Sequence, residues 1–368
     1  MAASPTATRY DLDRDALAAQ LAGEPRYRVD QIWQGLYGQL AELSDLTALP
    51  RALRARLAQS IPNALTLAAE SSTANGDTVK WLWHLLDGAQ IETVLMHYRD
   101  RSTVCVSTQA GCAMACGFCA TGQAGFARNL SSGEIVEQVV RAARRARAEH
   151  RRVSNVVFMG MGEPLANYER TWQAIERIHG DIGVSARHLT VSTVGIVPGI
   201  RRLATEPLPV NLAVSLHAAN DQLRDELVPI NRRYSLTALV DACEAYAAAK
   251  NRRLSFEWAL IESVNDRAVD ARELAALARR LHAHVNLIPL NATPGYATVG
   301  SAPHVVRDFR DRLTGLGVNV TVRRNRGTEI DAACGQLAAR HASEATHATV
   351  AVHSPIARRT TATARMSP

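Results

Sequence analysis

The chain is poor in cysteine and in aromatic residues. Its 368 residues include only 6 Cys, far too few for a disulfide-rich scaffold. With 5 Trp, 8 Tyr and 5 Phe, few side chains are available to stack on single-stranded bases. No run of about 18 apolar residues occurs, so we expect no membrane span. The first residues, MAASPTATRYDLDRD, contain no apolar segment typical of a secretory signal. We therefore expect a cytoplasmic protein whose thiols stay reduced.

The remaining composition is that of a folded protein. Hydrophobic residues make up 47% of the chain and charged residues 21%, which excludes wholesale disorder. At roughly 150 residues per domain, the length suggests about two domains. The formal net charge of +7 favours a polyanionic partner such as nucleic acid, but net charge alone is weak evidence.

The two ends of the chain differ from its middle. Residues 1–75 are expected to form a small helical domain, in which Ile32, Leu36 and Leu40 recur at a spacing of four. Residues 76–100 contain two β-rich runs around Asp87-Gly88, a pair that favours a hairpin turn. Residues 341–368 are small, polar and basic with little periodicity, so we expect a disordered tail there.

Between residues 101 and 340, short apolar runs alternate with amphipathic helices, which predicts an α/β fold of parallel β/α units. The predicted strands span 103–108, 155–160, 189–195, 211–216, 254–261, 285–290 and 318–322. Their number suits a full or partial (β/α) barrel, whose functional sites gather at the carboxyl ends of the strands. A doubly wound open sheet fits the periodicity nearly as well, but no nucleotide-binding glycine motif supports it.

Three of the six cysteines lie close together in the sequence. Cys112, Cys116 and Cys119 form the pattern C-x3-C-x2-C just after a predicted strand. A tetrahedral zinc site needs four ligands, and no fourth Cys or His follows at a usual spacing. Three thiolates on a four-iron cluster would instead leave one iron open to a small molecule. A zinc site completed by a distant residue, or three reduced core thiols, stay as alternatives.

The cysteine segment resembles the RlmN/Cfr family of radical S-adenosylmethionine (SAM) enzymes, with the RlmN branch the nearer one. C-x3-C-x2-C is the signature of radical SAM enzymes, and the string CVSTQAGCAMACGFCATGQAGFARNL is similar to that of the family. Matching segments run from about residue 20 to 340. The resemblance implies a partial-barrel radical SAM core with an N-terminal accessory RNA-binding domain. It also implies a [4Fe-4S] cluster on Cys112, Cys116 and Cys119, with SAM bound to the fourth iron.

The resemblance further implies a set of SAM contacts. In Gly160-Met161-Gly162-Glu163-Pro164 the glycines let a ligand approach the backbone, and Glu163 can accept a hydrogen bond from a ligand ammonium. Other polar residues follow later strands, as expected at the mouth of a barrel. The implied contacts are Gly162, Glu163, Ser192, Ser215, Leu216, His217 and Asn291. Val194 departs from the family, which often carries a second serine there, and Ser192 is therefore the residue chosen in that loop.

Two more thiols and one carboxylate complete the implied catalytic set. Cys334 in DAACGQL matches the family cysteine that carries a methyl group, and Cys105 in STVCVST matches the second essential thiol. Glu92 in QIETVL is the implied general base near the target adenine, although a glutamate on a strand usually faces solvent. Cys243 has no family role, and its apolar helical face predicts a core residue.

The implied activity is radical methylation of RNA. A methyl group would pass from one SAM to Cys334, a radical made from a second SAM would remove hydrogen from it, and its carbon would add to C2 of adenine. Attack of Cys105 on Cys334 would then form a transient disulfide and free the product. The implied substrates are an adenine in 23S rRNA and the adenine 3′ of the anticodon in tRNAs. The target base must leave its stack to reach a buried site.

Two groups of arginines have a possible role in RNA binding. The second group lies directly before the Cys334 segment and is predicted to contact phosphates. The first group is either a phosphate-binding patch or a solvated helix face. The first group is Arg141, Arg144, Arg145, Arg147, Arg151 and Arg152, and the second is Arg323, Arg324 and Arg326.

We expect a monomer without membrane contact that takes electrons from a flavodoxin- or ferredoxin-like donor. Two other functions stay open. A C8-adenine methyltransferase of the Cfr type would use the same motifs. A non-catalytic iron–sulfur protein that binds RNA would explain the charge and the cluster, but it gives no role to Cys334 or to the segment around Glu163.

Overall fold

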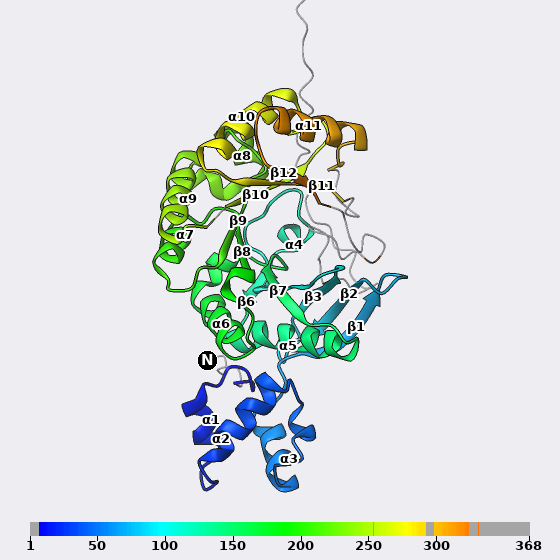
Figure 1. Ribbon diagram of the computed structural model, residues 1–368, viewed down its shortest axis with the longest axis vertical. Coiled ribbons are helices and arrows are strands. Elements are labelled where there is room, and N and C mark those ends of the chain that lie inside the picture. Colours follow the sequence, from blue (N-terminus) through cyan, green and yellow to red (C-terminus); the bar gives the residue numbers. More distant parts are fainter. Residues whose placement is uncertain (1–6, 253, 292–297, 324–329, 331–368) are drawn as a thin grey trace, which may run out of the picture.

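The computed structural model describes residues 7–252, 254–291, 298–323 and 330 (Figure 1). Three residues for which the sequence predicts a function, Cys334, Arg324 and Arg326, lie outside the described residues, as does the C-terminal tail. Among the helices that are described, none is both long and apolar enough to pass through a membrane.

Within the described residues, ten strands form one sheet, in the order β1-β2-β3-β4-β7-β8-β9-β10-β11-β12. Neighbouring strands from β4 onward are parallel, whereas β1 to β4 pair antiparallel. The strands are β1 (Thr66–Ser72), β2 (Thr78–His84), β3 (Gln90–His97), β4 (Ser102–Cys105), β7 (Val153–Phe158), β8 (Leu189–Thr193), β9 (Asn211–Ser215), β10 (Ser255–Leu260), β11 (His284–Pro289) and β12 (Val320–Val322). A separate hairpin joins β5 (Gln109–Gly111) to β6 (Phe126–Asn129).

Helices alternate with the parallel strands and lie mostly along the outer side of the sheet (Figure 1). They are α4 (Ala120–Gln123), α5 (Ser132–Ala148), α6 (Tyr168–Gly180), α7 (Val197–Thr205), α8 (Asp221–Leu227), α9 (Leu236–Lys250), α10 (Ala268–Arg280) and α11 (Pro303–Gly315). Short turns η3 (Pro164–Asn167), η4 (Ala186–His188) and η5 (Pro229–Arg232) lie between them. Among the described strands, β1 and β12 end the sheet, and this open β/α architecture confirms the predicted α/β partial barrel.

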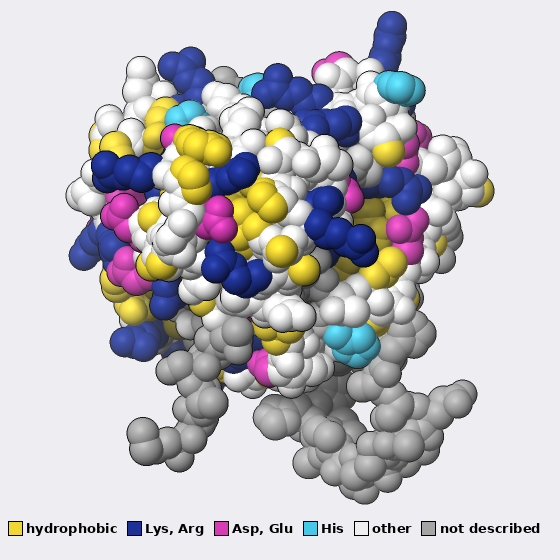
Figure 2. Space-filling model, turned by 90° about the horizontal axis from the view of Figure 1, so that it is seen from below, with side chains coloured by type: hydrophobic (Ala, Val, Ile, Leu, Met, Phe, Trp, Pro, Cys, Tyr) yellow, Lys and Arg dark blue, Asp and Glu magenta, His cyan; other side chains and the backbone are white. Residues whose placement is uncertain are grey.

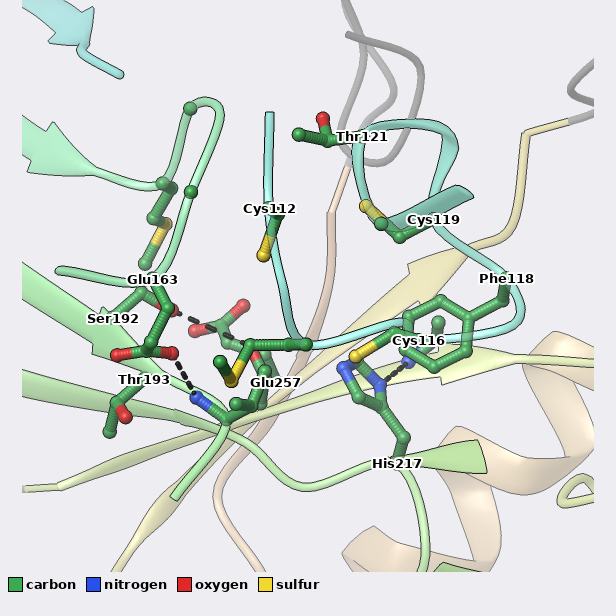
Figure 3. Close-up of a pocket in the computed structure, with 18 of the residues that line it drawn as sticks. Cys112, Cys116, Phe118, Cys119, Thr121, Glu163, Ser192, Thr193, His217 and Glu257 are labelled. Atoms are coloured by element: carbon green, nitrogen blue, oxygen red, sulfur yellow. Dashed lines mark hydrogen bonds between the residues drawn. The ribbon is translucent and has the colours of Figure 1, made fainter. Parts of the chain in front are cut away.

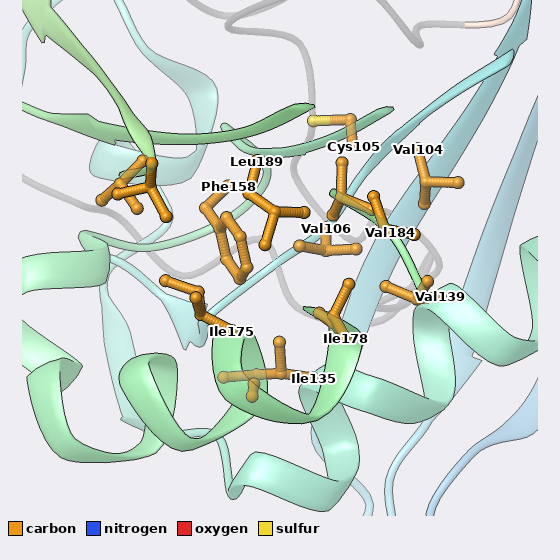
Figure 4. Packing of buried hydrophobic residues seen from close by; sticks show 14 of the residues in the cluster. Val104, Cys105, Val106, Ile135, Val139, Phe158, Ile175, Ile178, Val184 and Leu189 are labelled. Carbon is orange, nitrogen blue, oxygen red and sulfur yellow. The ribbon is translucent and has the colours of Figure 1, made fainter. Parts of the chain in front are cut away.

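Helix α5 shows how the local sequence builds this architecture. Ser131 and Glu134 form a capping box, in which each side chain binds the backbone N–H of the other residue. Ile135 and Val139 then recur at helical spacing and pack in the main hydrophobic core with Phe158 of β7 (Figure 4). Full burial of each such side chain contributes about 1.5–3 kcal/mol. The helix is thus fixed both at its start and along its apolar face.

The N-terminal helices form the lower end of the molecule in Figure 1. They are α1 (Arg14–Gln20), α2 (Tyr27–Trp33), the π-helical turn η1 (Gln34–Gly38), the turn η2 (Leu43–Asp45) and α3 (Arg51–Ser60). The predicted repeat of Ile32, Leu36 and Leu40 is right for the first two residues. Leu40 lies beyond the end of the helix, with φ +57, and is nevertheless buried.

Two details of the predicted front segment are resolved by the structure. Residues 66–72 were expected in the helical region but form β1, an edge strand whose sequence TLAAESS carries little β signal and which pairs with β2. The hairpin prediction is confirmed, since β2 and β3 are joined across Asp87-Gly88 with Gly88 at φ +84.

Cys243 is fully buried in the core, as its helical face predicted.

Candidate active site

A cavity of about 150 Å³ lies at the carboxyl ends of the parallel strands. Its wall comes from the loop after β5, the loop after β7, the ends of β8 and β9, and residues of β10 and β11. Figure 3 shows side chains from these separate segments directed toward one space. This is the edge of a parallel barrel at which loops can carry chemistry without disturbing the core.

The three clustered cysteines all line this cavity. Cys112, Cys116 and Cys119 lie on the loop that joins β5 to α4. The loop backbone is held by the N–H of Cys112, which donates to the carbonyl of Gly125 at 2.7 Å, and by the N–H of Cys119, which donates to the carbonyl of Cys116 at 3.2 Å. The structure therefore brings together the three residues that the sequence predicts as cluster ligands.

The three thiols surround a space and do not converge on one point. In the described part of the chain, no three Cys, His, Asp or Glu side chains form a site for a single metal ion. A four-iron cluster binds each thiolate through a different iron, so ligands spread around one cavity fit it.

Burial determines the protonation state of these thiols. It raises the pKa of Cys112 to about 11, and it raises the pKa of Cys116 well above the usual range. Both thiols therefore stay protonated at neutral pH unless positive charge is brought close to them. Metal ions supply such charge and deprotonate the thiols that coordinate them. The donor set thus fits a cationic metal cluster.

Glu163 is buried in the same wall, in the loop after β7. Its Oε1 accepts the N–H of Leu165 at 2.9 Å, and its Oε2 accepts the N–H of Val194 at 2.8 Å. Burial raises the pKa of Glu163 to about 7, although the two backbone donors oppose this shift. Each carboxylate oxygen has a second lone-pair position, so the group can still accept a donor such as an amino group from the cavity.

Gly162 has a structural role in addition to the one expected of it. It has φ +101, and a Cβ at this position would lie 2.5 Å from Cβ of Gln109. The sequence interpretation was that this glycine admits a ligand. In the structure its close neighbour is the chain segment that leads to the cysteines, although Gly162 also lines the cavity. Gly162 thus presses the Glu163 loop against the cysteine-bearing segment.

The ends of β8 and β9 supply hydroxyl groups. Ser192 of β8 and Ser215 of β9 both line the cavity, with their Oγ atoms 3.5 Å apart. Val194, where relatives often carry a serine, contributes its backbone N–H to Glu163 and also lines the cavity. A polar side chain at position 194 is therefore not needed for the contact between these two loops.

His217 follows β9 with φ +58 and lies in the cavity wall. Burial, with a smaller contribution from the charge of Arg224, lowers the pKa of His217 to about 3, so the ring is neutral. Its Nδ1 accepts the N–H of Ala259 at 3.0 Å, which assigns the ring proton to Nε2. The ring of Phe118, from the cysteine loop, meets His217 edge-on at 4.4 Å between centroids.

Two of the predicted SAM contacts lie behind the wall. Leu216 is buried; its N–H donates to the carbonyl of Glu257 at 3.0 Å, and its own carbonyl accepts from Arg224 at 3.2 Å. Asn291 is buried directly after Leu290, which lines the cavity. Neither Leu216 nor Asn291 is among the described residues that line the cavity.

The sequence analysis missed Glu257 as a wall residue and assigned Arg323 to a different task. Both line the cavity, and the guanidinium of Arg323 lies 3.4 Å from Oε2 of Glu257. Oε1 of Glu257 accepts from Asn286 at 2.8 Å. Arg323, for which the sequence predicts a contact with RNA phosphates, lies in the cavity wall through this ion pair. A glutamate within the apolar strand LSFEWALI was the signal that could have identified Glu257.

Glu92 and Cys105 share one face of the sheet. Cys105 ends β4 and is opposite Val94 of β3, and Glu92 lies two residues from Val94, on the same side of the strand. Glu92 is buried, with Oε1 3.6 Å from Nζ of Lys80, so it is not a solvent-facing glutamate. Figure 4 shows the Cys105 sulfur directed away from the side of the sheet that α5 and α6 cover. Neither Glu92 nor Cys105 lines the described cavity, and Cys334 lies outside the described residues.

The first group of arginines differs in exposure, since Arg141, Arg144 and Arg145 are half-buried whereas Arg147, Arg151 and Arg152 are exposed. Arg144 donates to the carbonyl of Ala41 at 2.8 Å and pairs with Glu42, and Arg141 lies 3.2 Å from the same carboxylate. Arg147 donates to the carbonyl of Gln39 at 2.5 Å. Arg145, Arg151 and Arg152 also have protein partners. Arg141, Arg144 and Arg147 thus join α5 to the N-terminal region.

The outer face of the N-terminal region is also mixed in charge. Figure 2, which views the molecule from that end, shows Lys and Arg side chains interspersed with Asp and Glu and with hydrophobic ones. The +7 charge of the chain is therefore not concentrated in one continuous patch on this face.

The chain is similar to known proteins of one enzyme class, in keeping with the residues of this cavity. Residues 106–278 match the family model of the radical SAM superfamily. The chain is 51% identical to the probable dual-specificity RNA methyltransferases RlmN of Chloroflexus aurantiacus and Thermobifida fusca, over 90% and 89% of this chain and 92% and 94% of theirs. It superposes on the crystal structure of a radical SAM methyltransferase from Sphaerobacter thermophilus with a TM-score of 0.88. That match is at 50% identity and covers 91% of this chain and 100% of the other.

The fold, the cysteine-lined cavity and these matches define a protein of the radical SAM class. Within that class, the chain belongs to the RlmN family of dual-specificity RNA methyltransferases.

Proposed function

We propose that this protein methylates C2 of adenine in RNA, acting on an adenine of 23S rRNA and on the adenine 3′ of the anticodon in tRNAs. One observation carries the proposal. Cys112, Cys116 and Cys119 line the same cavity as Glu163, in a chain about half identical to proteins named dual-specificity RNA methyltransferases.

The cavity wall has the residues needed to hold both cofactors. Cys112, Cys116 and Cys119 would hold a [4Fe-4S] cluster. The SAM ligands would be Gly162, Glu163, Ser192, Ser215 and His217, supported from behind by Leu216 and Asn291. When bound, the cluster supplies the electron that cleaves SAM and starts radical chemistry. That electron would come from a flavodoxin- or ferredoxin-like donor, and we expect the enzyme to work as a cytoplasmic monomer.

The protein's own side chains would orient the cofactor and keep water out. Glu163 would accept a hydrogen bond from the SAM amino group, and the hydroxyls of Ser192 and Ser215 would bind polar edges of the ligand. Apolar wall residues such as Phe118 and Leu290 would exclude water from reactive species. Exclusion matters because a carbon radical in a wet site would be lost to side reactions.

The two thiols outside the cluster would carry and release the methyl group. Cys334 would take a methyl group from SAM as a thiolate and later be joined through that carbon to adenine. The thiolate of Cys105 would attack the Cys334 sulfur, so that an S–S bond forms while the S–C bond to the RNA breaks. An external reductant would then return both thiols. The position of Cys105 on the inner face of the sheet supports this role.

Glu92 or Cys105 would take the proton that C2 of adenine loses. The shared sheet face of Glu92 and Cys105 supports either choice. Lys80, 3.6 Å from Glu92, would stabilise the carboxylate before it accepts the proton. If Glu92 is the base, the variant Glu92→Gln should slow methylation strongly while SAM binding stays unchanged, whereas little effect on the rate would point to Cys105.

Access of RNA to this site requires that the target base leave its stack. We propose that residues 1–75 act as the accessory RNA-binding domain, that residues 76–100 extend the sheet as a hairpin, and that residues 101–340 form the catalytic core.

The test is anaerobic incubation of the reconstituted protein with RNA, SAM and a reductant, followed by mass spectrometry of the nucleosides. We expect 2-methyladenosine in both rRNA and tRNA. Formation of 8-methyladenosine would show a Cfr-type activity instead. Repeated absence of any methylated adenosine, with an intact cluster, would indicate a non-catalytic RNA-binding protein.

A further inference from the structure

Arg224 of α8 is a cation buried directly behind the cavity. Its side chain is 0% exposed. The guanidinium donates to the carbonyl of Val194 at 2.5 Å, to the carbonyl of Leu216 at 3.2 Å and to Oδ1 of Asn231 at 2.8 Å. All three acceptors are neutral. Among the described residues no carboxylate lies within ion-pair distance of Arg224, although a buried charge is normally paired.

The nearest carboxylates reach Arg224 only through an amide. The Nδ2 of Asn231 donates to Asp221 at 2.8 Å and to Asp225 at 2.7 Å. These two bonds fix the orientation of the amide, so that its oxygen faces Arg224. The charges of Asp221 and Asp225 therefore compensate the guanidinium only at a distance, and part of its positive charge is left for another partner.

Arg224 holds two segments of the cavity wall in place. Both polar backbone groups of Val194 are hydrogen-bonded. Its N–H donates to Glu163 and its carbonyl accepts from Arg224. Gly195, at φ +110, allows this approach, because a Cβ there would lie 3.3 Å from a guanidinium nitrogen. Arg224 also binds Leu216, between Ser215 and His217 of the wall. The carbonyls of the loops after β8 and β9 are thus held by one side chain.

The same cation lies next to the cysteine loop. Residues Leu223 and Leu227, on the helix that carries Arg224, pack in one buried group with Cys116. A guanidinium in this position stabilises negative charge on the group that the cysteines hold.

We propose that Arg224 is a positioning residue that serves as the buried counter-cation of the cysteine-ligated cluster and holds the two SAM-binding loops in place. Three thiolates outweigh the positive charge of an oxidised four-iron core, and one added electron makes the whole group more negative. Arg224 favours that reduction, in which an external donor loses one electron, the core gains it and no bond changes. Net charge and hydrogen bonding near a cluster set its potential.

This inference rests on the proposed cluster site, and the experiment is chosen to separate the two. Wild-type protein, Arg224→Met and Arg224→Lys are reconstituted anaerobically without RNA. Cluster content, the midpoint potential followed by electron paramagnetic resonance, and the dissociation constant of SAM are measured. Absence of a cluster in the wild type would overturn the site itself, whereas methyl transfer plays no part in these readouts.

Arg224→Met should disfavour reduction of the cluster at least about tenfold, which is about 59 mV for a one-electron couple. It should also weaken SAM binding. Arg224→Lys keeps the charge but cannot bind both carbonyls, so its potential should stay near the wild-type value while SAM binding weakens. The matched control is Arg9→Met, which removes a guanidinium that is 5% exposed and paired with Glu42, away from the site. It should change neither readout.

Two results would overturn the proposal. The first is an unchanged potential in Arg224→Met with the cluster fully incorporated. The second is an equal fall of potential in Arg224→Met and Arg224→Lys, which would assign the effect to packing and not to charge. If Arg224→Met fails to incorporate the cluster, recovery in Arg224→Lys supports the counter-cation, and failure in both variants contradicts it.

Discussion

Two polar networks in this protein arrange their charges differently. Where α5 meets the N-terminal region, opposite charges touch directly, as in the pairing of Glu42 with Arg144. Around the cavity, Glu163 and Arg224 are both buried but do not touch, because Val194 lies between them and binds each through its backbone. We call these the junction network and the site network.

The difference shows in the acid strength of the two carboxyls. Although burial opposes it, Arg144 and two other arginines hold the pKa of Glu42 below its usual range. Burial raises the pKa of Glu163 to about 7. Charges that pair directly are satisfied within the protein and act in stability. Charges that are kept apart by neutral backbone groups retain their electrostatic influence and suit a charged ligand.

The largest effect is expected from removing a cluster ligand. Cys116→Ala should lose essentially all cluster binding, because three thiolates are the only protein ligands proposed. Cys243→Ala, which removes a buried core thiol with no proposed ligand role, should keep full iron and sulfide content and lose only about 1 kcal/mol of stability. Chemical analysis of the anaerobically reconstituted proteins decides the matter. Equal iron content in Cys116→Ala and Cys243→Ala would contradict the assignment of the cysteine loop as the segment that binds the cluster.

The next largest effect should come from Glu163→Gln. A neutral amide can accept only one of the two backbone N–H groups, and its NH₂ would face the other donor. Charged hydrogen bonds are worth about 1.5–3 kcal/mol, so SAM affinity should fall roughly 10- to 100-fold. Glu137→Gln, at a fully buried glutamate of the junction network, is the matched control. It should lower stability without changing SAM affinity in equilibrium dialysis, and equal losses of affinity would contradict the distinction.

Glu42→Ala tests whether the junction network contributes to stability without affecting the site network. It leaves Arg9, Arg141 and Arg144 without their shared carboxylate. Because Glu42 is partly exposed, we expect a loss of about 2 kcal/mol, less than for a fully buried pair. Chemical denaturation measures this loss. SAM affinity and cluster potential should not change, and a change in either would show that the two networks are coupled.

The raised pKa of Glu163 predicts a pH dependence of stability in the cofactor-free protein. Between an ordinary carboxyl pKa and about 7, the folded state keeps a proton that the unfolded state has lost. Stability from this group therefore falls as pH rises through that window, by about 1.4 kcal/mol per pH unit, and is level above it. The difference in unfolding free energy between wild type and Glu163→Gln isolates the effect. A difference that is constant from pH 5 to 7 would refute it.

The smallest effect is expected from Arg145→Ala. Arg145 pairs on the surface with Glu149 and Glu70. Exposed pairs of this kind contribute about 0.2–1 kcal/mol. Because the arginine already has protein partners, the salt dependence of RNA binding should not change. If Arg145→Ala reduces the magnitude of the slope of log affinity against log salt by about one, Arg145 contacts an RNA phosphate and this prediction is wrong.

The part of the site that the sequence predicted depends on short-range pattern. The strands were predicted from local apolar runs, and the three cavity-lining cysteines, Cys112, Cys116 and Cys119, from their spacing. Glu163 was predicted because it follows a strand, and Ser192 and Ser215 because they lie near the ends of strands that reach the same edge of the sheet.

What the sequence did not reveal depends on contacts between distant segments. Arg144 binds Glu42 from 102 positions away, so no local pattern distinguishes it from a solvated arginine. Arg224 binds Val194 from 30 positions away, and no spacing marks it as buried. Residues 66–72 form strand β1 because they pair with β2, since their own sequence favours no particular structure.

The most direct test of the central claim uses SAM that carries three deuterium atoms on its methyl group. If Cys334 carries the methyl group and a radical removes one hydrogen from it, the 2-methyladenosine formed in RNA should retain two of the three deuterium atoms. Mass spectrometry of the nucleoside measures this number. A product that keeps all three would show direct transfer of an intact methyl group and would contradict the account.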